Sequence, residues 1–196
     1  VFSAIDGRAP TFEDDFSARK TEWLLEGKSD NPNCKNTSTE MANGVIHMVA
    51  DTNPGTGCWT WAHLPKIDLY GAVIQMDINL EKSYSKGDLI LEDSAGHFIT
   101  FSLSHNGAWN MGFCNNVNNN VECPITKDGF TSSYQGNPAT ILLISYGSSI
   151  AVWVDSRPLG ILNSRPRELT LPAHLSITVQ NEDDPINIVE FDNIRI

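Results

Sequence analysis

The sequence is short of basic residues, since 13 Lys and Arg stand against 24 Asp and Glu, and its formal net charge is -11. Nucleic acids and anionic membrane surfaces are bound by clustered Lys and Arg, so this balance argues against both kinds of partner. The excess acid has two interpretations: it keeps the chain soluble outside the cell, or part of it lines a cation site.

Long apolar runs are missing as well. No stretch approaches the roughly 20 apolar residues that a membrane-spanning helix needs, so we expect no membrane insertion. Residues 1–4 do not begin a basic segment followed by a long apolar one, so we expect no signal peptide in this chain. A mature protein whose signal had been removed has the same appearance, so this start is compatible with secretion.

Several catalytic and metal-binding motifs are also absent. No His-Glu-x-x-His spacing occurs, and no serine lies in a Gly-x-Ser-x-Gly elbow. No Cys-x-x-Cys pair occurs, and no histidine lies at ligand spacing to a cysteine, which disfavours a four-thiolate metal site. We therefore expect surface or capping roles for the five histidines, which are His47, His63, His97, His105 and His174.

The four cysteines lie beside polar stretches that are too poor in apolar residues to pack alone. Cys114 and Cys123 bracket an Asn-rich run, residues 115–122, which we interpret as a loop. Cys34 lies in a similar polar stretch, and Cys58 opens an aromatic strand. We predict the disulfides Cys34–Cys58 and Cys114–Cys123, each worth roughly 2–4 kcal/mol.

Disulfides form in oxidising compartments, so these pairs indicate a secreted, extracellular or cell-surface protein. The single sequon Asn36-Thr37-Ser38 would permit glycosylation in a eukaryote, although such tripeptides often arise by chance.

Period-2 alternation of apolar and polar residues dominates the chain, and no window of about 12 residues shows a helical stripe. Clusters of Gly, Asn, Asp, Ser and Pro separate the candidate strands, and no linker divides them. We predict one all-β domain over residues 1–196, a two-sheet antiparallel jelly-roll sandwich of about a dozen strands. The expected strands are 11–16, 21–26, 45–50, 58–63, 71–80, 88–92, 98–104, 109–114, 140–146, 150–154, 176–180 and 187–196.

Three segments carry a family resemblance. Residues 12–17, Phe-Glu-Asp-Asp-Phe-Ser with Trp23 shortly after, resemble the start of concanavalin-like jelly-roll domains of secreted bacterial proteins. The β-meander around residues 152–155, Val-Trp-Val-Asp, is similar to a hairpin of laminin-G-like and concanavalin-like domains, with Ser156 where that hairpin usually has glycine. Residues 191–194, Phe-Asp-Asn-Ile, resemble their final strand, which pairs near the first. The resemblance implies a scaffold rather than an activity.

Laminarinase-type glycoside hydrolases share this fold and carry a Glu-x-Asp-x-x-Glu arrangement on one strand. No such triplet occurs here, and the nearest acidic strand segments are Glu92-Asp93 and Glu190-Phe191-Asp192. Fold analogy alone does not establish an activity. We therefore expect a protein that is not an enzyme.

Jelly rolls often join their first and last strands through a structural Ca²⁺, an ion that takes carboxylate and carbonyl oxygens. The resemblance implies such a site between Asp14 or Asp15 near the start and Asp192 near the end, and we take Asp15 and Asp192 as its ligands. In the alternative, Asp14 and Asp15 cap a turn while Asp192 bonds a loop. We also expect the opening strand around Phe16 to lie close to the closing strand.

The aromatic residues are the strongest indication of a ligand. Trp59 and Trp61 are two apart, so their side chains share one face of one strand. Trp109 follows at a strand entrance with Asn110 beside it. Indoles stack on the apolar faces of sugar rings and Asn bonds hydroxyls, so these four residues could bind an extended glycan; the alternative is that the indoles fill the core.

For Trp23 and Trp153, flanked by alternating apolar residues, we expect the core. The resulting prediction is an extracellular carbohydrate-binding or adhesive module that does not cleave its ligand. The alternatives are a structural subunit of an extracellular filament, sheath or surface layer, and a glycoside hydrolase. The expected partner is a glycan or an extracellular protein.

Overall fold

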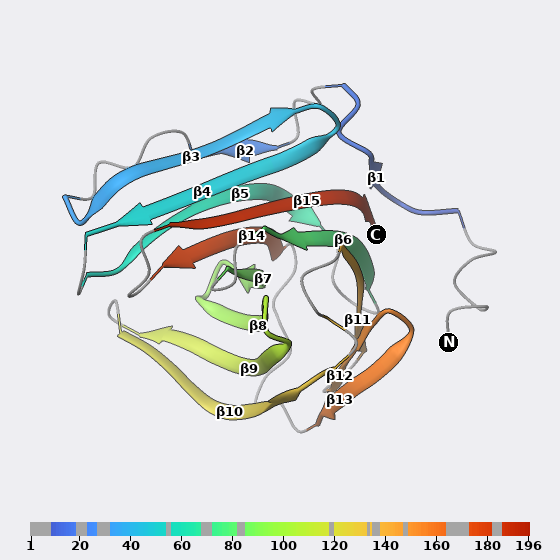
Figure 1. Ribbon diagram of the computed structural model, residues 1–196. Coiled ribbons are helices and arrows are strands. Elements are labelled where there is room, and N and C mark those ends of the chain that lie inside the picture. The colour runs from blue at the N-terminus through green and yellow to red at the C-terminus, as the bar shows by residue number, and fades with distance from the viewer. Residues whose placement is uncertain are drawn as a thin grey trace.

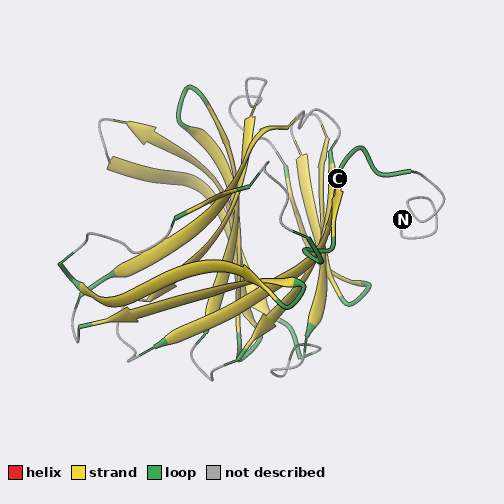
Figure 2. Ribbon diagram, turned by 90° about the horizontal axis from the view of Figure 1, so that it is seen from above, coloured by secondary structure: helices red, strands yellow, loops and turns green. Residues whose placement is uncertain are grey.

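The computed structural model describes residues 9–18, 23–26, 32–53, 56–67, 72–81, 85–117, 120–132, 134, 138–146, 149–163, 173–181 and 186–196. Every regular element in these ranges is a β-strand, and Figure 2 shows strands and loops only. The strands are β1 (Glu13–Asp14), β2 (Leu24–Leu25), β3 (Cys34–Ala42), β4 (Val45–Thr52), β5 (Cys58–Ile67), β6 (Val73–Leu80), β7 (Lys86–Asp93), β8 (His97–Ser104), β9 (Ala108–Val117), β10 (Asn120–Phe130), β11 (Ala139–Tyr146), β12 (Ser149–Val154), β13 (Arg157–Leu162), β14 (Ala173–Asn181) and β15 (Asn187–Arg195). The described part of the chain has no helix that is long and apolar enough to cross a membrane.

The strands form two antiparallel sheets. The eight-stranded sheet has the order β13-β12-β11-β6-β15-β4-β3, with β1 added against β15, and the seven-stranded sheet has the order β10-β9-β8-β7-β14-β5-β2. In Figure 1, β7, β8, β9 and β10 follow one another from the middle of the molecule to its lower edge. This arrangement confirms the predicted two-sheet antiparallel jelly roll.

The core lies between the two sheets, because alternate residues of a strand point to opposite faces. Ile74, Met76 and Ile78 of β6 are at most 1 % exposed, and so are Leu89 and Leu91 of β7. These inward positions leave the intervening residues of each strand on an outer face. The outer faces of the two sheets are therefore the surfaces on which a site can be built.

The two ends of the chain meet on the eight-stranded sheet, as predicted for the opening and closing strands. Strand β1 pairs with β15, with Asp14 opposite Ile194, and the two strands lie side by side in Figure 1. The Asp14 carboxylate accepts bonds from the Phe16 backbone N–H at 3.0 Å and from Trp23 Nε1 at 3.2 Å. Trp23 is 4 % exposed, which confirms its predicted place in the core.

Both predicted disulfides are confirmed, Cys34–Cys58 and Cys114–Cys123. The first joins β3 to β5 and so links the two sheets. The interpretation of residues 115–122 as a loop is wrong for residues 115–117 and 120–122, because β9 and β10 pair there with Asn120 opposite Val117. Residues 118 and 119 lie outside the described residues. Asn116, Val121 and Glu122 are exposed, as expected for a hairpin whose strand β10 lies at the edge of the sheet.

Candidate active site

Strand β7 places two carboxylates on the outer face of the seven-stranded sheet. Leu89 and Leu91 turn inward, so Asp88, Ile90 and Glu92 share the outer face. The glycine before them is required by the core, because a Cβ at Gly87 would lie 2.7 Å from Ile78 Cδ1 of the other sheet. The two sheets therefore approach closely at Gly87, the residue before Asp88.

Glu92 lies at one end of a continuous row of rings that crosses three strands. It is opposite His174 on β14. The His174 ring lies 4.6 Å from the His63 ring of β5, which in turn lies 5.8 Å from Trp61. His63 Nδ1 is fixed by a 2.8 Å hydrogen bond with Ser176 Oγ. The row therefore connects a carboxyl group to the indole platform predicted from the sequence.

The environment of Glu92 favours its protonated form. Burial raises the pKa of the Glu92 carboxyl, the charge of His174 lowers it, and the charge of Asp93 raises it further, with a net upward shift. Burial also lowers the pKa of His63, and the charge of His174 adds to that effect. A carboxyl group with a raised pKa on an open sheet face is suited to donate a proton to a bound ligand.

Asp88 occupies the other end of this part of β7. Its side chain is nearly buried, and its Oδ2 accepts a 3.3 Å hydrogen bond from Thr178 Oγ1. The Lys86 ammonium lies 3.6 Å from Oδ1. Glu92 follows Asp88 by four positions, so the strand rise places their Cα atoms about 13 Å apart. Ile90 lies between them on the same face. Counted from Asp88, the second and third positions of the Glu-x-Asp-x-x-Glu spacing fall on Ile90 and Asp93, while Glu92 is the acid that shares the outer face with Asp88.

Trp61 and Asn110 belong to the same cross-strand row as Asp88. Asn110 is opposite Ser102, Ser102 is opposite Asp88, Asp88 is opposite Thr178, and Thr178 is opposite Trp61. Trp61 is half-buried, and Asn110 is exposed. Trp61 and Asn110, both predicted from the sequence to bind a ligand, therefore lie on opposite sides of Asp88.

Trp59 continues the indole platform along β5, with 52 % of its surface exposed. Trp109 does not join it: its side chain is only 7 % exposed and packs in the core. The prediction of Trp109 as a ligand-binding residue is wrong, because successive residues alternate faces and Asn110 takes the outer one. Of the four residues proposed to bind a glycan, three lie on one outer face.

Asp15 and Asp192 lie on the other sheet, near the pairing of β1 with β15. Burial raises the pKa of Asp192, and a hydrogen bond from the Asn193 backbone lowers it. The negative charges of Asp77, Asp15 and Glu190 raise this pKa further, and the net shift is upward. Both residues also make the local contacts of a turn: Asp15 Oδ1 accepts bonds from the Ser17 N–H and Oγ, at 3.1 and 2.8 Å. The two carboxylates are close enough to repel each other, and the Ca²⁺ between them stays a prediction.

Four residues on the outer face of the seven-stranded sheet were not predicted as site residues from the sequence: Asp88, Glu92, His63 and His174. The spacing Asp88-x-Ile90-x-Glu92 within a predicted strand would have placed both acids on one face. The approach of His174 to Glu92 carries no local signal, because it depends on the pairing of β14 with β7.

No protein-family model matches this chain, and no curated protein sequence matches it either. Several solved structures, in contrast, are similar to this chain. The β-glucanase of Bacillus licheniformis superimposes with a TM-score of 0.71 at 13% identity, over 95% of this chain and 97% of that one. A laminarinase from Flavobacterium gives 0.67 at 14% identity over 95% and 99%, and a family 16 glycoside hydrolase endo-glucanase from Bacteroides ovatus gives 0.69 at 11% over 94% and 98%. The chain therefore has the concanavalin-like jelly-roll fold of these proteins.

These comparisons contradict the expectation of a non-catalytic binding module and of a protein that is not an enzyme. The similar structures include β-glucanases, laminarinases, an endo-β-galactosidase and a κ-carrageenase, whose names describe cleavage of glycans. The expectation rested on the absence of the Glu-x-Asp-x-x-Glu triplet; it considered Glu92 only together with Asp93 and did not consider Asp88, which shares a face of β7 with Glu92.

Proposed function

We propose that this protein is a secreted glycoside hydrolase that acts on an extended glycan bound across the outer face of the seven-stranded sheet. The observation that carries the proposal is the shared face of β7, where Asp88 and Glu92 lie in rows that also hold Trp61, His174 and Asn110. The fold shared with glycan-cleaving enzymes supports the same reaction class. The two disulfides support an oxidising, extracellular location.

In this proposal Glu92 is the general acid. Its raised pKa favours the protonated carboxyl group, whose proton passes to the glycosidic oxygen as the bond to the anomeric carbon breaks. A water molecule then forms the new bond to that carbon and gives its proton back to the Glu92 carboxylate. Asp88 supplies the second carboxylate, and its negative charge stabilises the positive charge that develops on the sugar ring. Ile90 provides no third acid between them, so we expect slower turnover than a three-acid strand would give.

Trp59 and Trp61 would hold neighbouring sugar rings by stacking. Both indoles lie on the same face of β5, and Trp61 lies two strands from Asp88 in the same row. Asn110, two strands from Asp88 on the other side, would bond sugar hydroxyls. Contacts on both sides of the acids favour a polymer that spans the sheet over a single sugar.

Release of reducing ends from a panel of polysaccharides tests this function. Mixed-linkage β-glucan, laminarin and κ-carrageenan are suitable first substrates, with Glu92→Gln as the variant and Glu122→Gln, an exposed change on β10, as its matched control. We expect cleavage of at least one polymer by the wild type and by Glu122→Gln, and loss of cleavage in Glu92→Gln. Equal rates in all three proteins would show that Glu92 is not the acid.

We also propose that Asp15 and Asp192 hold a structural Ca²⁺, as the resemblance implies. Their oxygen donors suit this ion, which would screen the mutual repulsion of the carboxylates around Asp192. The proposed role is to hold β1 against β15, with no part in glycan cleavage. Contact with an extracellular protein partner or assembly stays a prediction.

A further inference from the structure

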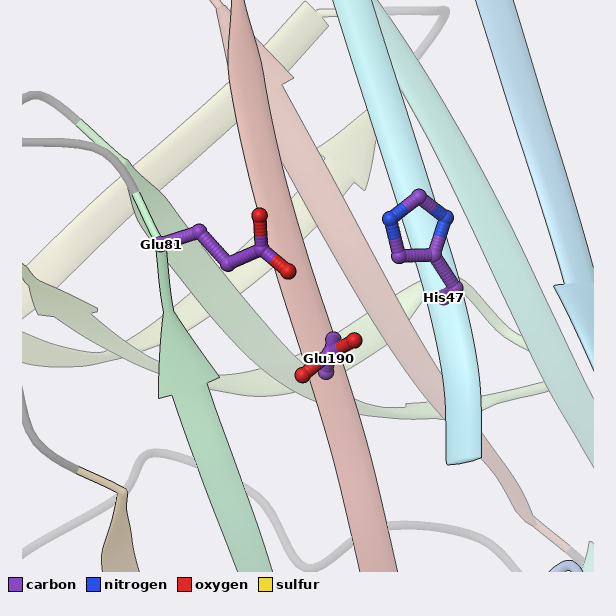
Figure 3. Close-up of side chains that lie close together, drawn as sticks. All are labelled: His47, Glu81 and Glu190. Atoms are coloured by element: carbon purple, nitrogen blue, oxygen red, sulfur yellow. The ribbon is translucent and has the colours of Figure 1, made fainter. Parts of the chain in front are cut away.

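A histidine and two glutamates meet on the outer face of the eight-stranded sheet, on the opposite side of the core from the proposed active site. His47 lies on β4, Glu190 on the neighbouring strand β15, and Glu81 directly after β6. One ligand atom from each lies within 4.8 Å of the other two. Figure 3 shows the two glutamates and the imidazole ring converging on one region of the sheet surface.

The two nitrogens of the His47 imidazole lie on opposite edges of the ring, and only one of these edges faces the two glutamates. Its Nδ1 lies 4.0 Å from Glu40 Oε1 on β3, the strand on its other side. The opposite edge of the ring, which carries Nε2, faces Glu81 and Glu190 in Figure 3. This separation is longer than a hydrogen bond, and rotation of the exposed Glu40 side chain would let it accept one from Nδ1–H, the contact that orients histidines bound to metals.

Glu190 is held by its neighbour on the other side. Asn79 Nδ2 of β6 donates a 2.9 Å hydrogen bond to Glu190 Oε2, and no other hydrogen bond to this carboxylate is found in the described ranges. Glu40, His47, Glu190 and Asn79 follow one another across four paired strands. The pairing therefore places two donors of the cluster side by side, with Glu40 and Asn79 next to them.

Glu81 supplies the adjustable donor. Its backbone N–H is anchored to the Ile188 carbonyl at 3.1 Å, while its side chain is exposed. Within the part of the chain that the structure describes, its carboxylate has no hydrogen bond or ion pair. Rotation of this side chain can shorten its distances to the other two donors without moving a strand.

We propose that His47, Glu81 and Glu190 form a binding site for a divalent transition-metal ion of the Zn²⁺ class. Zn²⁺ takes one imidazole nitrogen and carboxylate oxygens at about 2.0–2.2 Å, which places tetrahedral donors about 3.4 Å apart. All three ligand atoms already lie within 4.8 Å of one another, so rotations of the Glu81 and Glu190 side chains can bring the donors to this spacing. Imidazole is a poor ligand for Ca²⁺, so the donor set selects a different ion from the one proposed at Asp15 and Asp192.

The ion would join β4, β15 and the end of β6 through side chains, so its role is to stabilise the eight-stranded sheet. An ion that binds only the folded protein raises its melting temperature as its concentration increases. The site lies outside the proposed active site, and it does not depend on the proposed glycosidase activity.

Calorimetric titration of the whole protein with zinc chloride tests the site, after chelator treatment and in excess calcium chloride to occupy the predicted Ca²⁺ site. The variants are His47→Gln and Glu81→Gln, and the matched controls are His63→Gln on the other sheet and Glu122→Gln on β10. Melting curves with and without zinc give a second readout. Glu81 is exposed, so its variant will fold even where the change at His47 disturbs β4.

We expect one zinc ion per wild-type chain, a melting temperature raised by zinc, and at least a tenfold loss of affinity in each of the two variants. Both controls should bind zinc as the wild type does. Absence of zinc binding in the wild type, or wild-type affinity in both variants, would overturn the proposal. So would loss of binding in His63→Gln alone, which would place the ion on the active-site face.

Discussion

The pKa of the Glu92 carboxyl group is set by neighbours that shift it in opposite directions. Burial and the Asp93 charge raise its pKa, while the charge of His174 lowers it. The sequence predicted the strand that carries Glu92, but not these neighbours, since His174 reaches it only through the pairing of β14 with β7. The shared face of Trp59 and Trp61, in contrast, follows from their spacing of two.

The pH dependence of cleavage follows from the sign of these effects. A general acid is active in its protonated form, so activity should fall as pH rises through the raised pKa of Glu92, at higher pH than for an unperturbed glutamate. His174→Gln removes a charge that lowers this pKa, so the fall should move to higher pH. The pH profile of kcat measures the shift, with His105→Gln as control. A shift to lower pH in His174→Gln would contradict this account.

Two tryptophans on opposite faces of the same sheet should respond differently to truncation. Trp59→Ala removes an exposed indole, so it should weaken glycan binding by on the order of 1–3 kcal/mol and leave stability nearly unchanged. Trp109→Ala opens a core cavity, so it should destabilise the fold by about 3–5 kcal/mol. Urea unfolding and glycan-binding titrations separate the two. A strongly destabilised Trp59→Ala would show that this indole packs rather than binds.

At the scale of strands, the sequence predicted the inner elements well and two edge strands not at all. Strands β3 and β10 were missed, and β13 was expected only as the return strand of the meander, without bounds; each of the three ends the order of its sheet. An edge strand pairs on one side only and carries exposed polar residues, so it shows little apolar alternation. Trp153 was expected in the core, but Val152 and Val154 of β12 turn inward and leave this indole half-buried on the outer face.

The two disulfides should contribute unequally because they close loops of different length. Sequence separations of 24 and 9 correspond to about 3.4 kcal/mol for Cys34–Cys58 and about 2.6 kcal/mol for Cys114–Cys123 in the chain-entropy model. Double alanine variants of each pair, compared by urea unfolding, measure the difference. A larger loss from the Cys114–Cys123 variant would show that hairpin pairing, rather than loop closure, dominates.

The predicted Ca²⁺ belongs to the pairing of β1 with β15. If Asp15 and Asp192 share the ion, chelator should lower the melting temperature of the wild type and leave Asp192→Asn unaffected. Asp51→Asn, a change on β4 outside the proposed ligand set, is the control and should keep the response. An unchanged wild-type melting temperature would remove the ion without affecting the strand pairing, which stands on its own contacts.

At the scale of the whole molecule, the two-sheet fold could be predicted because alternation runs along most of the chain. That residues 1–196 form one domain stays a prediction. The reaction class could not be derived in the same way, because it depends on which outer-face residues the sheet order brings together. Asp88, Trp61 and Asn110 come from three strands that are far apart in the sequence and share one row only in the folded sheet.

The central claim is that a glycan lies across the outer face of the seven-stranded sheet with its scissile bond at Glu92. A crystal structure of Glu92→Gln with an oligosaccharide of the cleaved polymer tests this most directly, because the variant should bind without cleaving. We predict sugar rings stacked on Trp59 and Trp61, and a glycosidic oxygen within about 2.6–3.2 Å of the Gln side chain at position 92. A sugar bound instead on the eight-stranded sheet, or bound with no glycosidic oxygen near β7, would contradict the account.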